Sequence, residues 1–237
     1  MSTRSRNKVL VAKDAQEFRR LGAESIGKKI AAAQLARGRC SLALSGGTTP
    51  GPVYEELGDS DLAARIEWEQ LEIFFADERA VPVDHPDSNY KLVKDTLLKS
   101  HPEALGLAYR MPADASDRDQ AAKRYGRRLP DPIDVLVLGM GADGHTASLF
   151  PGSAALDESE ARVVAVTAPK PPPQRMTITP AVIGRSRSIV MLVRGAEKAP
   201  MVARALSGVV DPKAVPAQLA RRAVWVLDQA AAAQLPI

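Results

Sequence analysis

A short apolar run that stops at glycine, within residues 133–151, is the feature that most constrains this chain. Residues 133–138 are apolar apart from Asp134, and such a run is typical of a buried strand in a parallel sheet. A glycine-rich turn follows and presents Asp143 and His145 where the strand ends. Because ligands of open α/β sheets bind beyond the carboxyl ends of the strands, this carboxylate–histidine pair is placed where chemistry is expected.

Apolar runs of this kind recur along the chain and alternate with segments of helical periodicity. Further expected strands fall at residues 9–12, 40–44, 71–76, 163–166, 188–193 and 223–227. Helix signals separate them: Asp14 and Glu17 form a predicted capping box before residues 15–37, and Gly38 stands where a helix C-cap belongs. Residues 176–183 are predicted to be helical as well. The alternation predicts a parallel α/β sheet with helices on both faces.

Composition limits the classes of function that fit. The chain has 237 residues, of which 45% are hydrophobic and 25% charged, as in an ordinary globular protein. Aromatic residues make up only 4%, which argues against a base-stacking surface for nucleic acid. The net charge of +4 comes from scattered basic residues and suits a small anionic substrate. Because there is one cysteine, no apolar stretch of membrane-spanning length and no secretory signal, we expect a cytoplasmic protein with no intrachain disulfide and no membrane partner.

A second glycine turn, Ser45-Gly46-Gly47-Thr48-Thr49-Pro50, follows the expected strand at residues 40–44. Thr49 and Pro50 fit the N-cap and the first residue of a helix. Backbone N–H groups and the positive end of a helix dipole would then point at one spot and cradle an anion. On this segment alone, a tight turn that happens to carry threonines remains an alternative.

Charged residues at other strand ends are further site candidates. Asp77, Glu78 and Arg79 follow the expected strand at residues 71–76, although a solvated loop explains them equally well. Three consecutive prolines shortly before Arg175 fit either a stiff loop that holds one side chain or a bare linker. Lys198 is predicted in the first turn of a helix, where the helix dipole disfavours a cation unless an anion compensates it.

Gly139, Gly141 and Gly144 match the G-x-G-x-x-G pattern of dinucleotide-binding sites. Three observations argue against a dinucleotide site. The pattern lies past the midpoint of the chain, and the next expected strand does not end in an acidic residue. In addition, the Asp143 carboxylate would repel a pyrophosphate. Asp143 and His145 instead fit a catalytic unit, in which a neutral histidine takes a proton from water and the carboxylate orients it. From these residues alone, an aspartate that caps the next helix and a histidine bonded to a carbonyl remain the alternative.

Five segments taken together resemble one known family over about the whole chain: SGGTTP, FFADERAVPVDHPDSNY, LGMGADGHTASLFPGS, KPPPQRMT and GAEKA. The family is that of the 6-phosphogluconolactonases, and DGHTASLFPG is its most specific segment. The resemblance implies a single α/β domain over residues 1–237, with a modified Rossmann-like parallel sheet, helices on both faces and a smaller α/β lobe. It also implies hydrolysis of 6-phosphoglucono-δ-lactone to 6-phosphogluconate, without a metal or a cofactor.

The resemblance also implies roles for individual residues. His145 would take a proton from water, and Asp143 would orient His145. Asp77 and Arg79 would lie near the sugar hydroxyls, and either Arg79 or backbone N–H groups of the glycine turns would stabilise the oxyanion. The phosphate would be bound by Gly46, Gly47, Thr48, Thr49, Arg175 and Lys198.

Two other functions are weighed against this one. Glucosamine-6-phosphate deaminases share ancestry with the family, and their corresponding segment looks like DGHIAFNEP. Their catalytic glutamate would fall at Phe150, which cannot move protons, so their chemistry is not expected here. A non-catalytic sugar-phosphate sensor would normally carry a helix-turn-helix domain, for which there is no room before Val9. We expect a monomer that binds a small phosphorylated sugar lactone and no nucleic acid.

Overall fold

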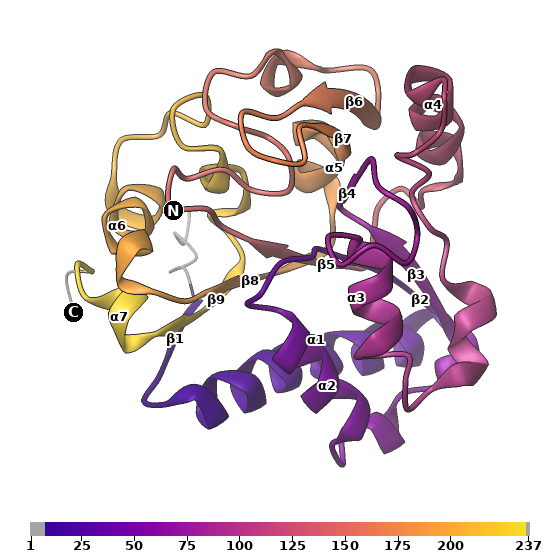
Figure 1. Ribbon diagram of the computed structural model, residues 1–237. Helices are drawn as coiled ribbons and strands as arrows, with labels where there is room; N and C mark the ends of the chain where they lie inside the picture. Colours follow the sequence, from indigo (N-terminus) through magenta and orange to yellow (C-terminus); the bar gives the residue numbers. More distant parts are fainter. Residues whose placement is uncertain (1–7, 236–237) are drawn as a thin grey trace.

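Six parallel strands form the central sheet of the computed structural model, which describes residues 8–235 (Figure 1). In spatial order they are β1 (Lys8–Ala12), β9 (Val224–Asp228), β8 (Ser188–Val193), β5 (Val135–Gly139), β2 (Cys40–Leu44) and β3 (Leu71–Phe75). The predicted parallel sheet is confirmed, and the apolar run at residues 133–138 supplies its interior strand β5. Because all the strands run the same way, their carboxyl ends meet at one edge of the sheet.

A second, antiparallel sheet consists of β4 (Asp77–Arg79), β7 (Gln174–Ile178) and β6 (Val163–Thr167), in that order. The chain passes between the sheets at Ala76, whose N–H donates to the Leu44 carbonyl and whose carbonyl accepts from the Ile178 N–H, both at 2.8 Å. This sheet belongs to the smaller lobe that was expected. The charged segment after β3 is therefore a strand of this sheet rather than a solvated loop, and the strand at residues 163–167 lies outside the parallel sheet.

The prediction that residues 176–183 are helical is wrong. β7 occupies the first part of this segment, and the helix α5 (Pro180–Arg185) begins only afterwards. β7 is the middle strand of the small sheet and pairs on both edges, so long-range hydrogen bonding decides its conformation. Proline at the first helical position marks the true start of α5.

Helices cover both faces of the parallel sheet, as predicted. α1 (Ala15–Arg37) lies below the sheet in Figure 1 and packs against several of its strands, whereas α6 (Ala199–Ser207) lies above it. α2 (Gly51–Asp59) packs against α1, and α7 (Gln229–Ala232) packs against β9. The other helices are α3 (Asn89–Asp95) and α4 (Arg118–Arg128), with short 3₁₀ segments at Ala63–Arg65, Trp68–Gln70, Pro102–Leu107, Ala154–Asp157, Ala196–Lys198 and Pro216–Ala220. In the part of the chain that the structure describes, no helix is both long enough and apolar enough to cross a membrane.

The ends of α1 follow from their local sequence. The Asp14 side chain accepts a hydrogen bond from the Glu17 N–H at 2.8 Å, and Gly38 takes the left-handed conformation with φ 72°. The predicted start and end of this helix are therefore confirmed. Within α1, Gly22 permits close packing on α2, because a Cβ atom there would lie 2.7 Å from Val53 Cγ1.

Asp134, the one charged residue of the central apolar run, is bound at the opposite edge of the sheet from the carboxyl ends. Its Oδ2 accepts hydrogen bonds from the N–H and Oγ of Ser41, both at 3.0 Å. Its Oδ1 lies 2.9 Å from Arg37 and 3.3 Å from Arg187. These partners satisfy the carboxylate just before β5 begins. Asp134 therefore connects the amino-terminal ends of β2 and β5 and does not belong to the candidate site.

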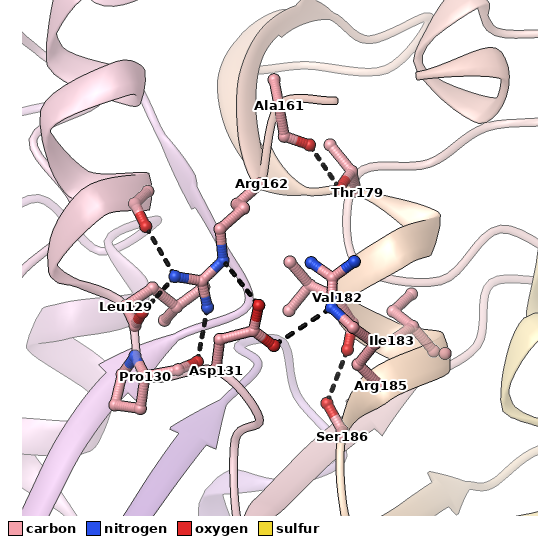
Figure 2. A network of polar contacts seen from close by, with 12 residues as sticks. Leu129, Pro130, Asp131, Ala161, Arg162, Thr179, Val182, Ile183, Arg185 and Ser186 are labelled. Carbon is pink, nitrogen blue, oxygen red and sulfur yellow. Dashed lines mark hydrogen bonds and ion pairs between the residues drawn. The ribbon is translucent and has the colours of Figure 1, made fainter. Parts of the chain in front are cut away.

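A polar network around Arg162 fastens the small sheet to α4 (Figure 2). Arg162 precedes β6 and donates to the carbonyls of Gly126 at 3.0 Å, of Pro130 at 2.5 Å, and of Leu129. These carbonyls lie in or just after the last turn of α4, where helical partners are lacking. Asp131 lies beside Arg162 and accepts from Arg185 of α5 at 3.0 Å. The small sheet that contains β4 and β7 is thus attached to α4 by hydrogen bonds from the Arg162 side chain to backbone carbonyls.

Candidate active site

The carboxyl ends of β2, β5 and β8 open onto a cavity of about 220 Å³, with β4 and β7 of the small sheet on another side. Loops that are distant in the sequence meet there because they follow neighbouring parallel strands. Every site residue predicted from the sequence lines this cavity, apart from Asp143. The predicted residues on its wall are Gly46, Gly47, Thr48, Thr49, Asp77, Arg79, His145, Arg175 and Lys198.

The turn after β5 holds His145 against Asp143. The turn is closed by hydrogen bonds from Thr146 Oγ1 to the Gly139 carbonyl at 2.8 Å and from the Gly141 N–H to the His145 carbonyl at 3.0 Å. His145 Nδ1 lies 2.5 Å from Asp143 Oδ1. An ionised carboxylate can only accept, so Nδ1 is assigned as the donor and Nε2 is left to accept a proton.

The surroundings of the pair favour a neutral imidazole beside a charged carboxylate. Burial lowers the pKa of His145, and this effect outweighs the opposing influence of Asp143. For Asp143, burial disfavours the charge, but hydrogen bonds from Lys170 and His145 lower its pKa to about 2. A histidine that is neutral at physiological pH can act as a base.

Gly141 is required by the close approach of this pair. A Cβ atom at position 141 would lie 2.2 Å from both Cε1 and Nδ1 of His145 and 2.6 Å from Asp143 Oδ1. No side chain fits there without moving the two catalytic candidates. The first two glycines of the G-x-G-x-x-G pattern therefore line a cavity with His145, and Gly141 makes room for the imidazole.

The second glycine turn forms the wall of the cavity after β2. Gly46 is packed against Asn89, whose Oδ1 would lie 1.8 Å from a Cβ atom at that position. Asn89 Nδ2 in turn donates to the Asp77 carbonyl at 2.8 Å, which connects this turn to β4. The helix start lies one residue later than predicted, because Pro50 rather than Thr49 is the N-cap of α2.

Arg175 is held on the cavity wall by the proline loop at residues 168–173. Its Nε donates to the Pro172 carbonyl at 2.9 Å, and its Nη2 donates to the carbonyls of Pro171 at 3.2 Å and Lys170 at 3.3 Å. Nη1 lies 3.3 Å from Ser148 Oγ. The loop thus holds one side chain, as in the first of the two readings of its sequence, and is not a bare linker.

Lys198 is the second cation of the cavity. It lies at the end of the 3₁₀ segment Ala196–Lys198 and is the N-cap residue of α6, so the predicted position at a helix start is confirmed. Burial lowers the pKa of Lys198. Within residues 8–235 its ammonium group has no ion pair and no hydrogen bond, which leaves it available to an anion.

Asp77 and Arg79 enter the cavity from β4. Asp77 is 5% exposed, and its Oδ2 accepts from Ser148 Oγ at 2.7 Å. Arg79 Nη1 donates to the Asp87 carbonyl at 2.6 Å, whereas its Nε has no partner among the described residues. Arg79 therefore keeps hydrogen-bond donors for a ligand.

A family model described as glucosamine-6-phosphate isomerases/6-phosphogluconolactonase matches residues 13–227. The chain belongs to this family. A 6-phosphogluconolactonase of Mycobacterium tuberculosis is 41% identical over 224 residues, which cover 87% of this chain and 90% of that protein. A 6-phosphogluconolactonase of Synechocystis is 36% identical over 220 residues, with 87% and 89% covered. The solved 6-phosphogluconolactonase structure from Trypanosoma brucei is similar with a TM-score of 0.83 at 31% identity, covering 97% of this chain and 98% of that one.

Several residues of this member of the family were not singled out for the site from its sequence, although they support it. Asn89 and Ser148 hold Asp77, and Lys170 binds Asp143. Ser148 stands three residues after His145, so its place in the same motif was an available signal, whereas Asn89 and Lys170 reach the site only through the fold. No group of three or more His, Cys, Asp or Glu side chains within residues 8–235 is arranged to hold a metal ion.

Proposed function

We propose that this chain hydrolyses 6-phospho-D-glucono-1,5-lactone to 6-phospho-D-gluconate, the lactonase reaction of the oxidative pentose phosphate pathway. The observation that carries the proposal is one cavity lined by a neutral histidine oriented by a carboxylate and by two cations, Arg175 and Lys198. Relatives that bear the name 6-phosphogluconolactonase support the choice of substrate.

His145 is proposed as the base. Its Nε2 takes a proton from water while the water oxygen forms a bond to the lactone carbonyl carbon. The tetrahedral intermediate then collapses, the bond from that carbon to the ring oxygen breaks, and the ring oxygen takes the proton back from Nε2. Asp143 holds Nδ1–H and stabilises the imidazolium that exists between the two proton transfers. A lactone is already a reactive ester, so the steps use no metal, cofactor or covalent nucleophile.

The phosphate of the substrate is proposed to bind at the glycine turn. Backbone N–H groups at Gly46, Gly47, Thr48 and Thr49 would donate to it, with Arg175 and Lys198 supplying positive charge. Arg79 and Asp77 would contact the sugar. Because Arg79 lines the cavity and, within the described residues, only the Nη1 of its guanidinium has a hydrogen-bond partner, it is the side chain we assign to the developing oxyanion.

Neither alternative function is favoured by an observation. Phe150 occupies the position at which the deaminases would have their catalytic glutamate. It lies buried against His145 and has no ionisable group that could transfer a proton. We further propose that residues 1–237 act as one domain, which the family match over residues 13–227 supports, and that the protein is a cytoplasmic monomer. Sedimentation of the purified protein tests the monomer.

The experiment that tests the function follows lactone disappearance against spontaneous hydrolysis. The wild-type protein is expected to accelerate it, and His145→Ala to lose about 10²–10⁴-fold in kcat while still binding 6-phosphogluconate. His85→Ala is the matched control, because His85 lies outside the cavity with a side chain 42% exposed. Near-normal turnover by His145→Ala would exclude the proposed base, and no acceleration by the wild-type protein would exclude the reaction.

A further inference from the structure

The proline loop reaches the catalytic pair through one side chain, that of Lys170. Lys170 Nζ lies 2.7 Å from Asp143 Oδ2, whereas His145 Nδ1 lies 2.5 Å from Oδ1 of the same carboxylate. Asp143 is therefore held from both sides, by one residue on each oxygen. The Lys170 side chain is 47% exposed, and an ion pair so exposed contributes little to the free energy of unfolding.

The main chain of the same residue is fixed by Arg175. Its carbonyl accepts from Arg175 Nη2, as does the carbonyl of Pro171, and the Pro172 carbonyl accepts from Nε. Consecutive prolines fix φ, so the backbone between these bonds is stiff. The Arg175 guanidinium thus fixes the backbone of Lys170, and the Lys170 ammonium group fixes the position of the Asp143 carboxylate.

Phe150 fills the space between these groups. Its ring stacks on His145 with a centroid distance of 4.3 Å, and its centroid lies 5.9 Å from Lys170 Nζ and 5.6 Å from Arg175 Cζ. Phe150 is 5% exposed, so it keeps water from one face of the imidazole. Cations near an aromatic ring are held in place by its quadrupole, which adds to the order of this corner of the site.

We propose that Lys170 is a positioning residue, which fixes the Asp143 carboxylate for His145 and joins the catalytic pair to the loop around Arg175. The inference rests on the proposed function, since it requires His145 to act as the base. Lys170 would contact neither the lactone nor the water and would act only through Asp143.

Because charged groups around His145 affect its pKa, the proposed role of Lys170 should be visible in the pH dependence of activity. Asp143 from the same turn and Asp77 from β4 favour the imidazolium, whereas Lys170 from the proline loop disfavours it. Arg175 of β7 lies 5.6 Å from the centroid of the Phe150 ring, on which His145 stacks. Removing the ammonium group therefore raises the pKa of His145, and removing the Asp143 carboxylate lowers it.

The experiment compares Lys170→Met, Lys170→Arg, Asp143→Asn and the Lys170→Met/Asp143→Asn double variant. Lys170→Met is expected to lower kcat about 3- to 10-fold with little change in KM, the loss of one partly exposed charged hydrogen bond. Its acid limb of kcat/KM should move to higher pH, whereas that of Asp143→Asn should move to lower pH. Lys170→Arg should restore most of kcat. In the Asp143→Asn background Lys170→Met should cost almost nothing further, because the two side chains act as one unit.

Lys213→Met is the matched control, because Lys213 makes an exposed ion pair with Asp157 at 2.6 Å outside the cavity. It should leave kcat and the pH profile unchanged. Wild-type kcat and pH profile in Lys170→Met, or an equal loss in the Asp143→Asn background, would overturn the inference. Lys170 is half exposed, so its variants are expected to fold, and thermal unfolding of each checks this. If His145→Ala keeps its turnover, the proposed base fails, and if the wild-type protein does not accelerate lactone hydrolysis, the proposed reaction fails. Both results differ from a failure of the Lys170 inference, which shows only in the Lys170 variants.

Discussion

Phe150 lies against His145, with the ring centroids 4.3 Å apart and the ring planes inclined by 28°. Burial is the main reason that the pKa of His145 is below its ordinary value, and Phe150 supplies part of that burial. The same position is where the resemblance places the catalytic glutamate of the sister family. A phenylalanine at this position has no ionisable group, and its ring helps to keep the imidazole of His145, the proposed base, neutral.

Phe150→Leu should move the pH dependence of the reaction. A smaller, non-aromatic side chain lets water reach the imidazole, so the pKa of His145 rises toward its ordinary 6.5. A base must be neutral, and activity is lost as the pH falls through its pKa. The acid limb of kcat/KM should therefore lie at higher pH in Phe150→Leu than in the wild type. A limb that stays in place or moves to lower pH contradicts this role, and Phe74→Leu, a buried change outside the cavity, should leave the limb where it is.

Gly141→Ala should damage catalysis more than stability. The added Cβ atom would come within 2.2 Å of His145 and 2.6 Å of Asp143, so one of the two side chains must move. A displacement of about 1 Å in a catalytic group can cost 10²-fold in rate, and we expect a loss of about that size in kcat. Gly184→Ala is the control, because a Cβ atom there meets nothing within 4 Å. Unchanged kcat in Gly141→Ala would show that the pair tolerates a different arrangement.

Arg175→Ala should mainly weaken the binding of phosphorylated ligands. Charged hydrogen bonds contribute roughly 1.5–3 kcal/mol, so the dissociation constant of 6-phosphogluconate should rise about 10- to 100-fold, measured by calorimetry. Arg175→Lys keeps the charge but loses the planar fork that binds the loop carbonyls, and its affinity should fall between the two. An unchanged dissociation constant in Arg175→Ala would remove this residue from the phosphate site.

Local patterns were enough to predict the parallel sheet and the positions where its strands end. The run before Gly139 and the caps of α1 depend on neighbours in the sequence, and there the predictions are confirmed. The antiparallel sheet could not be predicted in the same way, because it forms where Ala76 and β4 meet β7, about a hundred residues later.

The same distinction applies to the site. Asp143 and His145 share one turn, and their contact follows from that turn. Lys170 reaches Asp143, and Asn89 reaches Gly46, only after the sheets have assembled, so no spacing in the sequence announces either contact. Residues at strand ends were therefore found from the sequence pattern, whereas Lys170 and Asn89, which hold them in place across the fold, were not.

Arg162→Ala should lower the free energy of unfolding more than Arg185→Ala does, although the two arginines are neighbours (Figure 2). Arg162 is 20% exposed and satisfies carbonyls of Gly126, Leu129 and Pro130 that would otherwise lack partners, whereas Arg185 is half exposed and pairs only with Asp131 among the described residues. Hydrogen bonds of a charged group support a loss of about 2–3 kcal/mol for Arg162→Ala, against less than about 1 kcal/mol for the exposed pair.

Urea unfolding of the two variants checks the difference, with lactonase turnover measured at low temperature in parallel. Because Arg162 lies outside the cavity, the folded fraction of Arg162→Ala should keep the wild-type KM. Equal stability of the two variants would mean that backbone packing alone holds α4 on the small sheet. A raised KM in a fully folded Arg162→Ala protein would mean instead that this network also sets the position of β7, and through it the position of Arg175.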